Sequence, residues 1–322
     1  MSKEDYQWPN YFYQPLDYST VNVNDGCLDY AEVEGLFSGY LPEVEYCLVS
    51  SGRSAISGVI QFLQLGRGDF VYAPPYSSHC IWDSICHFCT PSSNLTLPVE
   101  LAIVVHKWAY VEKVGSCTHK NIIEDSVDNL IDKNTTLFPN NGFVEIISLP
   151  KVTGSCAGAL VLSRNSQLLD FLRDQRQADP ALSIHQSLLR NRSLLGKNDS
   201  LQAWSHNEWK NQGMAAADLK NIAEYAKNWN LNARVIRQRR EYLVAKLGEA
   251  LVHIEDDLER FPPVMPASTD KLRVDTEKLM VRNFNVSRIS SMPDYKPHYL
   301  IPVHMGIDDE LFEFLVSRIS LL

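Results

Sequence analysis

Apolar positions follow two different spacings along the first half of the chain. Continuous apolar runs of strand length alternate with segments in which apolar residues recur every three or four positions, the spacing of an amphipathic helix. Strands alternating with helices predict an α/β fold with a mostly parallel sheet and helices on both of its faces. The expected strands are Tyr46–Val49, Phe70–Ala73, Leu101–His106, Asn121–Glu124, Val144–Leu149 and Ala157–Leu162. The expected helices are Asp29–Leu41, a segment that follows Ser50–Ile56 and ends near Leu65, and Ser78–His87.

The pattern changes after Ser163. Helical spacing dominates as far as Ala250, and a mixture of short apolar runs and a closing helix, Asp308–Leu321, follows. The long helices are expected at Gln167–Arg176, Ala181–Leu195, Met214–Trp229 and Leu231–Ala250, and the late strands at Leu279–Val281 and Leu300–Val303. We therefore expect an N-terminal arm (1–28), a large α/β domain (29–230) and a smaller C-terminal α+β domain (231–322).

Polar residues stand at the carboxyl ends of the expected strands. They are Ser50–Ser54, Tyr76–His79, His106, Asp125 and Lys151. Ligands of open parallel sheets bind at this edge. The sequence therefore predicts that these five groups surround a ligand site.

Three of these groups have chemistry of their own. Ser51-Gly52-Arg53-Ser54 lies between a strand and a helix, where backbone N–H groups can bind phosphate, although the same residues also cap ordinary helices. Asp125 ends a buried strand and needs a cationic or donor partner there, unless it caps the following turn.

Lys151 lies in a tight bend between two apolar runs. Loss of hydration at the edge of a core favours the neutral amine that forms a Schiff base. Taken alone, the stretch favours a solvated loop lysine. A phosphate cradle, then an aspartate, then a lysine, each at a strand end, is however the arrangement that pyridoxal phosphate (PLP) requires.

The amino-acid composition argues against several classes of binding partner. The formal net charge of -9 argues against nucleic acid or an anionic membrane surface as the main partner. The chain begins without an apolar signal segment, and no apolar stretch is long enough to span a bilayer. Seven cysteines without framework spacing indicate reduced thiols, so we expect a cytoplasmic protein. Cys86 and Cys89 form a CxxC without a second ligand pair, so no metal site is expected.

Several motifs carry a resemblance to a known family. They are CLVSSGRSAI, GRGDFVYAPPYSSHCIWDSI, LAIVVH, NIIEDSVD, EIISLPK with AGALVL, and PHYLIPVHMGIDDELFEFLVSRI. With these motifs the chain resembles the DegT/StrS family of fold-type-I PLP-dependent sugar aminotransferases. The resemblance extends from about residue 29, weakly between 165 and 280. The 26-residue separation of Asp125 and Lys151 fits the family spacing.

The resemblance implies roles for individual residues. Lys151 would form the internal aldimine and carry the proton in the transfer, and Asp125 would pair with the pyridine nitrogen. The other implied cofactor contacts are Gly52, Arg53 and Ser54 on the phosphate with help from Ser148, His79 or Ser78 stacked on the ring, and Asn207 reaching a partner subunit's site. Asp128 stands where the family has Gln or His, which places an extra carboxylate beside the cofactor.

The resemblance also implies an activity. The expected enzyme is a homodimeric, PLP-dependent aminotransferase that moves an amino group, with glutamate as donor, to a nucleotide-linked keto sugar in polysaccharide biosynthesis. Asp128, Ala109 in place of a family glycine, the short chain and the unrecognisable sugar-binding loops depart from the family pattern. Two alternatives stay open: a lyase or amino-acid aminotransferase on the same fold, and a non-catalytic member with a regulatory or binding role.

Overall fold

The computed structural model describes most of the chain from residue 28 onward. The described residues are 28–94, 96–108, 110–114, 121–153, 155–176, 184–190, 210–211, 213–252, 259–275, 280–285 and 295–322. The expected N-terminal arm and Asn207 lie outside these residues, apart from Leu28 at the end of the arm. No helix in the described part of the chain combines the length and the apolar character needed to cross a bilayer.

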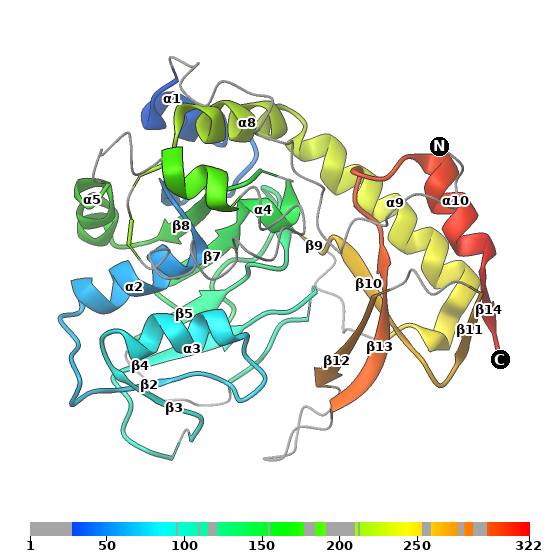
Figure 1. The fold of residues 1–322 in the computed structure, drawn as a ribbon, viewed down its shortest axis with the longest axis horizontal. Helices are drawn as coiled ribbons and strands as arrows, with labels where there is room; N and C mark the ends of the chain where they lie inside the picture. The colour runs from blue at the N-terminus through cyan, green and yellow to red at the C-terminus, as the bar shows by residue number, and fades with distance from the viewer. Residues whose placement is uncertain are drawn as a thin grey trace.

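A seven-stranded sheet forms the centre of the molecule (Figure 1). Its strands, in spatial order, are β1 (Glu45–Val49), β8 (Ala159–Ser163), β7 (Val144–Ser148), β5 (Ile122–Asp125), β4 (Leu101–Val105), β2 (Phe70–Tyr72) and β3 (Thr90–Ser92). β8 is antiparallel to β1 and β7, and the other neighbouring pairs are parallel. The carboxyl ends of all strands except β8 therefore lie at one edge, and the expected mostly parallel sheet is confirmed.

Helices cover both faces of this sheet. The alternation in β8 shows the two faces, because Ala159 and Val161 join one apolar cluster while Leu160 and Leu162 join the other. The first cluster contains residues of α2 (Gly52–Phe62), α3 (His79–Cys86) and α5 (Ser166–Asp174). The second contains residues of α1 (Tyr30–Gly35), α8 (Ala216–Lys227) and α9 (Trp229–Leu247). The sheet is thus buried on both faces, as its near-continuous apolar strands predict.

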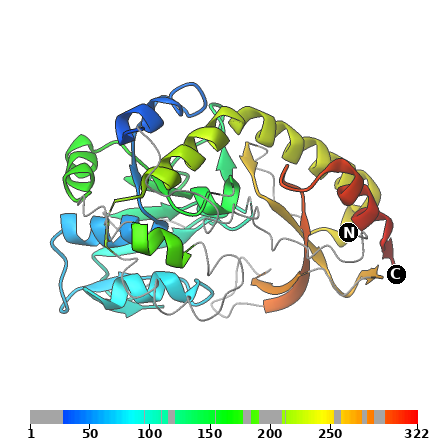
Figure 2. The same cartoon turned by 45° about the horizontal axis from the view of Figure 1, so that its top comes forward.

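The C-terminal part is built on a second, antiparallel sheet. It contains β10 (Val264–Ser268), β13 (Tyr295–Pro302) and β12 (Met280–Asn285). Only Asn228 separates α8 from α9, and Figure 2 shows the two helices running on from one another, from the large sheet toward this second sheet. The domain boundary near residue 230 stays a prediction.

The closing helix is shorter than expected. α10 (Asp309–Ser317) ends at Ser317, and β14 (Ile319–Leu321) pairs with β11 (Leu272–Val274). The expectation that the helix runs to Leu321 was therefore wrong over its last residues. Apolar residues at the end of the chain are compatible with a helix or a strand, and pairing with β11 favours the strand.

A buried ion pair joins the C-terminal part to the central sheet. β9 (Arg260–Phe261) pairs with β6 (Leu130–Ile131), and this brings the fully buried Arg260 guanidinium within 2.6 Å of Glu145 Oε1 on β7. Arg260 Nη1 also donates to Ser126 Oγ at 2.7 Å. Ser126 directly follows the last residue of β5, so this network holds the ends of two strands that lead into the site described below.

Candidate active site

A cavity of about 490 Å³ lies at the carboxyl edge of the central sheet. Its volume falls in the range of small-molecule sites. Most of the residues that the sequence assigned to the site line it: Gly52, Arg53, His79, Asp125, Asp128, Ser148 and Lys151. Segments far apart in the sequence therefore meet in one cavity, as the strand-end pattern predicted.

Lys151 lies on a single helical turn, α4 (Leu149–Val152), between β7 and β8. Pro150 stands in the first turn, where its missing N–H costs nothing. The lysine side chain is 26% exposed, and its Nζ donates to Asp128 Oδ1 at 2.9 Å. The lysine is therefore neither buried nor free in solvent. Its side chain reaches the cavity and pairs there with the Asp128 carboxylate.

Gly158 holds the segment after Lys151 close to the first strand. Its φ is +104°, a conformation that residues with a Cβ rarely adopt, and an added Cβ would lie 2.8 Å from Ile222 Cδ1. Its N–H donates to the Ser50 carbonyl at 2.9 Å. Gly158 therefore connects the lysine segment to the residues that lead into α2.

Asp125 is the last residue of β5 and is 1% exposed. Burial raises the pKa of its carboxyl to about 6, with Lys151 opposing the rise and Asp128 adding to it. Within the described residues the Asp125 carboxylate accepts one hydrogen bond, from the backbone N–H of Val127 at 3.1 Å. A carboxylate so buried is stabilised by a cationic partner, and a protonated pyridine nitrogen would supply one.

The N-terminus of α2 forms another wall of the cavity. Ser51, Gly52 and Arg53 line it, whereas Ser54 does not. Ser54 Oγ accepts from the Ser51 N–H at 3.0 Å and donates to the Ser51 carbonyl at 2.8 Å, within a capping box. Ser54 therefore takes part in a helix cap, which was the other interpretation of this motif. A contact of Ser54 with phosphate stays a prediction. The Ser148 hydroxyl makes no hydrogen bond to the described residues and faces the cavity as a lining group.

Aromatic and polar side chains complete the lining. Ser78 and His79 both lie there and are exposed, so either can stand beside a cofactor ring. Trp108 and Tyr76 also line the cavity. Tyr76 belongs to a strand-end group that the sequence identified, but nothing in the sequence distinguished Trp108. Trp108 was missed because its place beyond β4 shows only in the folded chain.

His106 differs from the expectation for the strand-end groups. Its side chain is fully buried, with Nε2 2.8 Å from Glu124 Oε2, and it does not line the cavity. Its Nδ1 accepts from the Glu112 N–H at 3.1 Å, so the proton lies on Nε2 and is donated to Glu124. The expectation that His106 faces the ligand is therefore wrong, because its imidazole bonds to the buried Glu124 on β5 and does not line the cavity.

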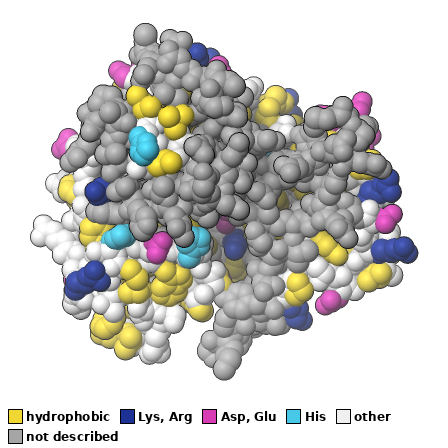
Figure 3. Space-filling model, in the orientation of Figure 1, with side chains coloured by type: hydrophobic (Ala, Val, Ile, Leu, Met, Phe, Trp, Pro, Cys, Tyr) yellow, Lys and Arg dark blue, Asp and Glu magenta, His cyan; other side chains and the backbone are white. Residues whose placement is uncertain are grey.

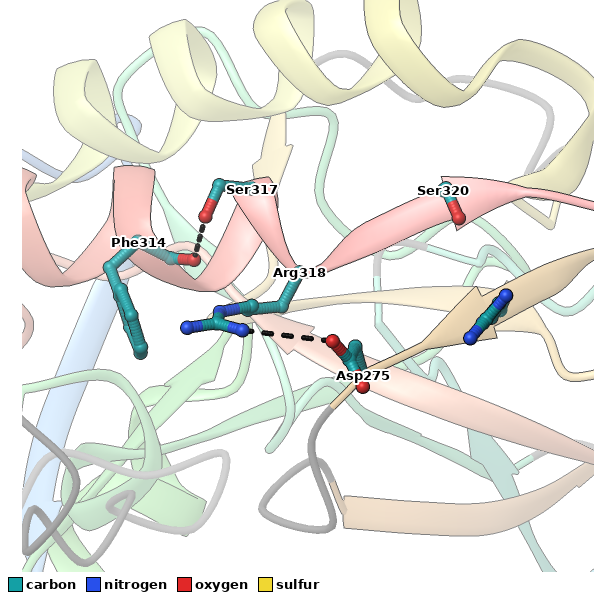
Figure 4. A pocket seen from close by; sticks show the side chains of 6 residues that line it. Asp275, Phe314, Ser317, Arg318 and Ser320 are labelled. Atoms are coloured by element: carbon teal, nitrogen blue, oxygen red, sulfur yellow. Dashed lines mark hydrogen bonds and ion pairs between the residues drawn. The ribbon is translucent and has the colours of Figure 1, made fainter.

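A second cavity, of about 500 Å³, lies near the C-terminus (Figure 4). Arg318 points toward Asp275 there, with Nη1 and Oδ2 3.6 Å apart, and both side chains are exposed. In Figure 3 basic and acidic side chains are interspersed along the edge where α10 lies. An exposed pair of this kind contributes little energy.

A family model described as "Putative PLP-dependent aminotransferase" matches residues 33–320. The chain belongs to this family of PLP-dependent aminotransferases. It is accordingly a transaminase whose cofactor is PLP, and the resemblance read from the sequence motifs is confirmed. No curated protein sequence matches the chain.

Solved structures of aminotransferases share the fold of this transaminase. A protein titled a DegT DnrJ EryC1 StrS aminotransferase from Brucella abortus has a TM-score of 0.60 at 11% identity, over 91% of this chain and 90% of that one. The PMP form of a putative sugar aminotransferase from Streptococcus pneumoniae has a TM-score of 0.58 at 10% identity, over 95% and 97%. The aminotransferase TlmJ from Streptoalloteichus hindustanus has a TM-score of 0.55 at 14% identity, over 93% and 97%. These likenesses establish the fold.

The cavity of this transaminase fits its cofactor. An amine at Lys151, a buried carboxylate at Asp125 and the N-terminus of α2 all line it. These are the three chemical partners that an aldehyde, a pyridine nitrogen and a phosphate group need. The family and the residues present therefore point to the same group.

Proposed function

We propose that this transaminase carries out its chemistry in the Lys151 cavity and transfers an amino group from glutamate to a nucleotide-linked keto sugar. The observation that carries the location is the convergence of Lys151, Asp125 and the α2 N-terminus on one cavity. The substrate rests on the family resemblance and on the likeness to the structure of a putative sugar aminotransferase from Streptococcus pneumoniae.

Each wall of the cavity has one task in this proposal. Lys151 would hold the cofactor's aldehyde, and its amine would carry the proton that leaves the substrate carbon. Asp125 accepts the pyridine N–H and keeps that nitrogen protonated. The N–H groups of Gly52 and Arg53 and the Ser148 hydroxyl bind phosphate. PLP, when bound, supplies the electron sink for the reaction.

The walls also favour an anionic substrate. Among the described residues, the charged side chains that line the cavity are Arg53, Lys107, Lys151 and Arg190, together with Asp125 and Asp128. Excess positive charge suits the phosphate groups of a nucleotide and the carboxylates of glutamate. The proposal further includes a homodimer, a cytoplasmic location and a role in polysaccharide biosynthesis.

Two spectroscopic steps test the location and the donor. Purified protein reconstituted with PLP should absorb in the visible, and glutamate should convert this band to the absorption of the aminated cofactor. Lys151→Ala should remove the band, and Lys210→Ala, a lysine that does not line the cavity, should keep it. A wild-type protein without a visible band, or a Lys151→Ala variant that retains it, would refute the location.

A third step tests the acceptor. The aminated form is mixed with nucleotide-linked keto sugars and, separately, with 2-keto acids, and return of the visible band is followed. Return with a nucleotide-linked keto sugar supports the proposed substrate. Return with 2-keto acids alone supports the amino-acid aminotransferase alternative and rejects the sugar substrate.

A further inference from the structure

One arginine in the cavity has not yet been assigned to a particular group of the cofactor or substrate. Arg190 ends the described helical segment 184–190, which packs through Ile184 and Leu188 against Cys156 and Ala217. Its side chain is 4% exposed and lines the same cavity as Lys151. Arginine is rarely buried without a partner, so the burial of this guanidinium indicates that an interaction holds it at the site.

The Arg190 guanidinium makes few hydrogen bonds to the described residues. Its Nη1 makes a long hydrogen bond of 3.4 Å to the Ser50 carbonyl, and its buried Nε has no hydrogen-bond partner among the described residues. A guanidinium carries five N–H donors and a full positive charge. Burying it without an anion costs several kcal/mol, so the site needs an anionic ligand at this place.

The position of this cation indicates which anion binds. Ser50 directly precedes Ser51, the N-cap of the eleven-residue helix α2. The guanidinium therefore lies beside the positive end of that helix, whose first turn contains Arg53 and no acidic residue. The cavity carboxylate Asp128 is already paired with Lys151. Two arginines and a helix N-terminus around one space match the two negative charges of a phosphate monoester better than a single carboxylate.

We propose that Arg190 binds the phosphate group of PLP, in the same chain that supplies Lys151. The inference rests on the proposed placement of the cofactor in this cavity. The segment around residue 190 thereby contributes to cofactor binding, although no phosphate-binding motif marks it in the sequence.

Dissociation constants for PLP and for pyridoxal, which lacks the phosphate, test this directly. Both are measured by absorbance titration of the cofactor-free wild type, Arg190→Gln and Arg190→Lys. Loss of a charged hydrogen-bond donor should weaken PLP binding roughly 10- to 100-fold in Arg190→Gln. Pyridoxal binding should change less than about twofold, and Arg190→Lys should lie between.

The matched control is Arg173→Gln. Arg173 donates to the Tyr46 carbonyl and does not line the cavity, so its loss should leave both constants unchanged. Circular dichroism checks the folding of each variant. Should Arg190→Gln fail to fold, Arg190→Lys carries the test, with a PLP constant raised at least about threefold and an unchanged pyridoxal constant.

Three results would overturn the inference. Equal weakening of PLP and pyridoxal would show that Arg190 does not contact the phosphate. Unchanged cofactor constants with a raised KM for glutamate would assign Arg190 to a substrate carboxylate. Unchanged cofactor constants with a raised KM for a nucleotide-linked sugar would assign it to the nucleotide phosphates. A wild-type protein that binds PLP without the Lys151-dependent band would count against the cofactor placement instead, so the two failures are distinguishable.

Discussion

Lys151 Nζ lies 2.9 Å from Asp128 Oδ1, and this ion pair joins the turn after β7 to the loop after β5. The sequence identified both residues, but it did not indicate that they meet. In the proposed function Lys151 would hold the cofactor's aldehyde, and its amine would then have to leave this ion pair. Asp128 therefore stabilises the form of Lys151 that does not react with an aldehyde.

Asp128→Asn should accelerate attachment of the cofactor. Removing the carboxylate frees the amine, and it also removes one of the charges that raise the pKa of Asp125. For a partly exposed pair we expect a two- to fivefold faster rise of the visible band at pH 7, measured by stopped-flow mixing with PLP. Asp128→Glu, which keeps the charge, is the control. An unchanged rate in Asp128→Asn would show that the pair does not restrain the lysine.

Lys151→Arg should abolish transamination with little loss of stability. An arginine can keep the ion pair with Asp128, but its guanidinium does not form the bond to an aldehyde. We expect loss of the visible band and of activity, with a change below about 1 kcal/mol in the free energy of unfolding. Urea unfolding and absorbance measure the two effects. Residual activity above that of Lys151→Ala would argue against the assigned role.

Asp125→Asn should stabilise the cofactor-free protein more as the pH rises. The folded-state pKa of about 6 exceeds the ordinary 3.8, so between these values the folded protein keeps a proton that the unfolded chain has lost. Wild type therefore loses about 3 kcal/mol relative to the variant as the pH rises from well below 3.8 to above 6, and most of this loss falls between pH 4 and 7.

Urea unfolding of both proteins at pH 4, 5, 6 and 7 measures this difference. Asp174→Asn, at an exposed position, is the control. A stability difference that stays flat across the range would contradict a raised pKa at Asp125. The same variant should bind PLP more weakly, because an amide does not balance the charge of a protonated pyridine.

Arg260→Met should destabilise the fold through Glu145. The two charges are fully buried and 2.6 Å apart, and removing one leaves the other without compensation. We expect a loss of about 3–5 kcal/mol in the free energy of unfolding, with partial recovery in the double variant Arg260→Met/Glu145→Gln. Arg237→Met is the control, because Arg237 is 51% exposed and 3.7 Å from Asp132, and it should cost less than about 1 kcal/mol. A double variant no more stable than the single one would point to packing instead.

Local patterns predicted most of the central sheet and its helices. β4 and β5 were recognised as continuous apolar runs, and α2 as a periodic segment after a serine cap, because burial on both faces or on one stripe leaves these spacings in the sequence. β14 was read as helix, because three residues at the chain end adopt a strand only when an edge such as β11 is present.

The sequence by itself determined the strand-end chemistry at Asp125, Lys151 and the start of α2, since parallel strands bring their carboxyl ends to one edge. Only the tertiary structure decided how these groups pair. In the folded chain Asp128 pairs with Lys151, and His106 bonds to Glu124. Ser54 belongs to a helix cap, and Arg190 reaches the cavity from a distant helix. Hydrogen bonds and ion pairs depend on positions within a few ångströms, and residue spacing along a chain does not specify such positions.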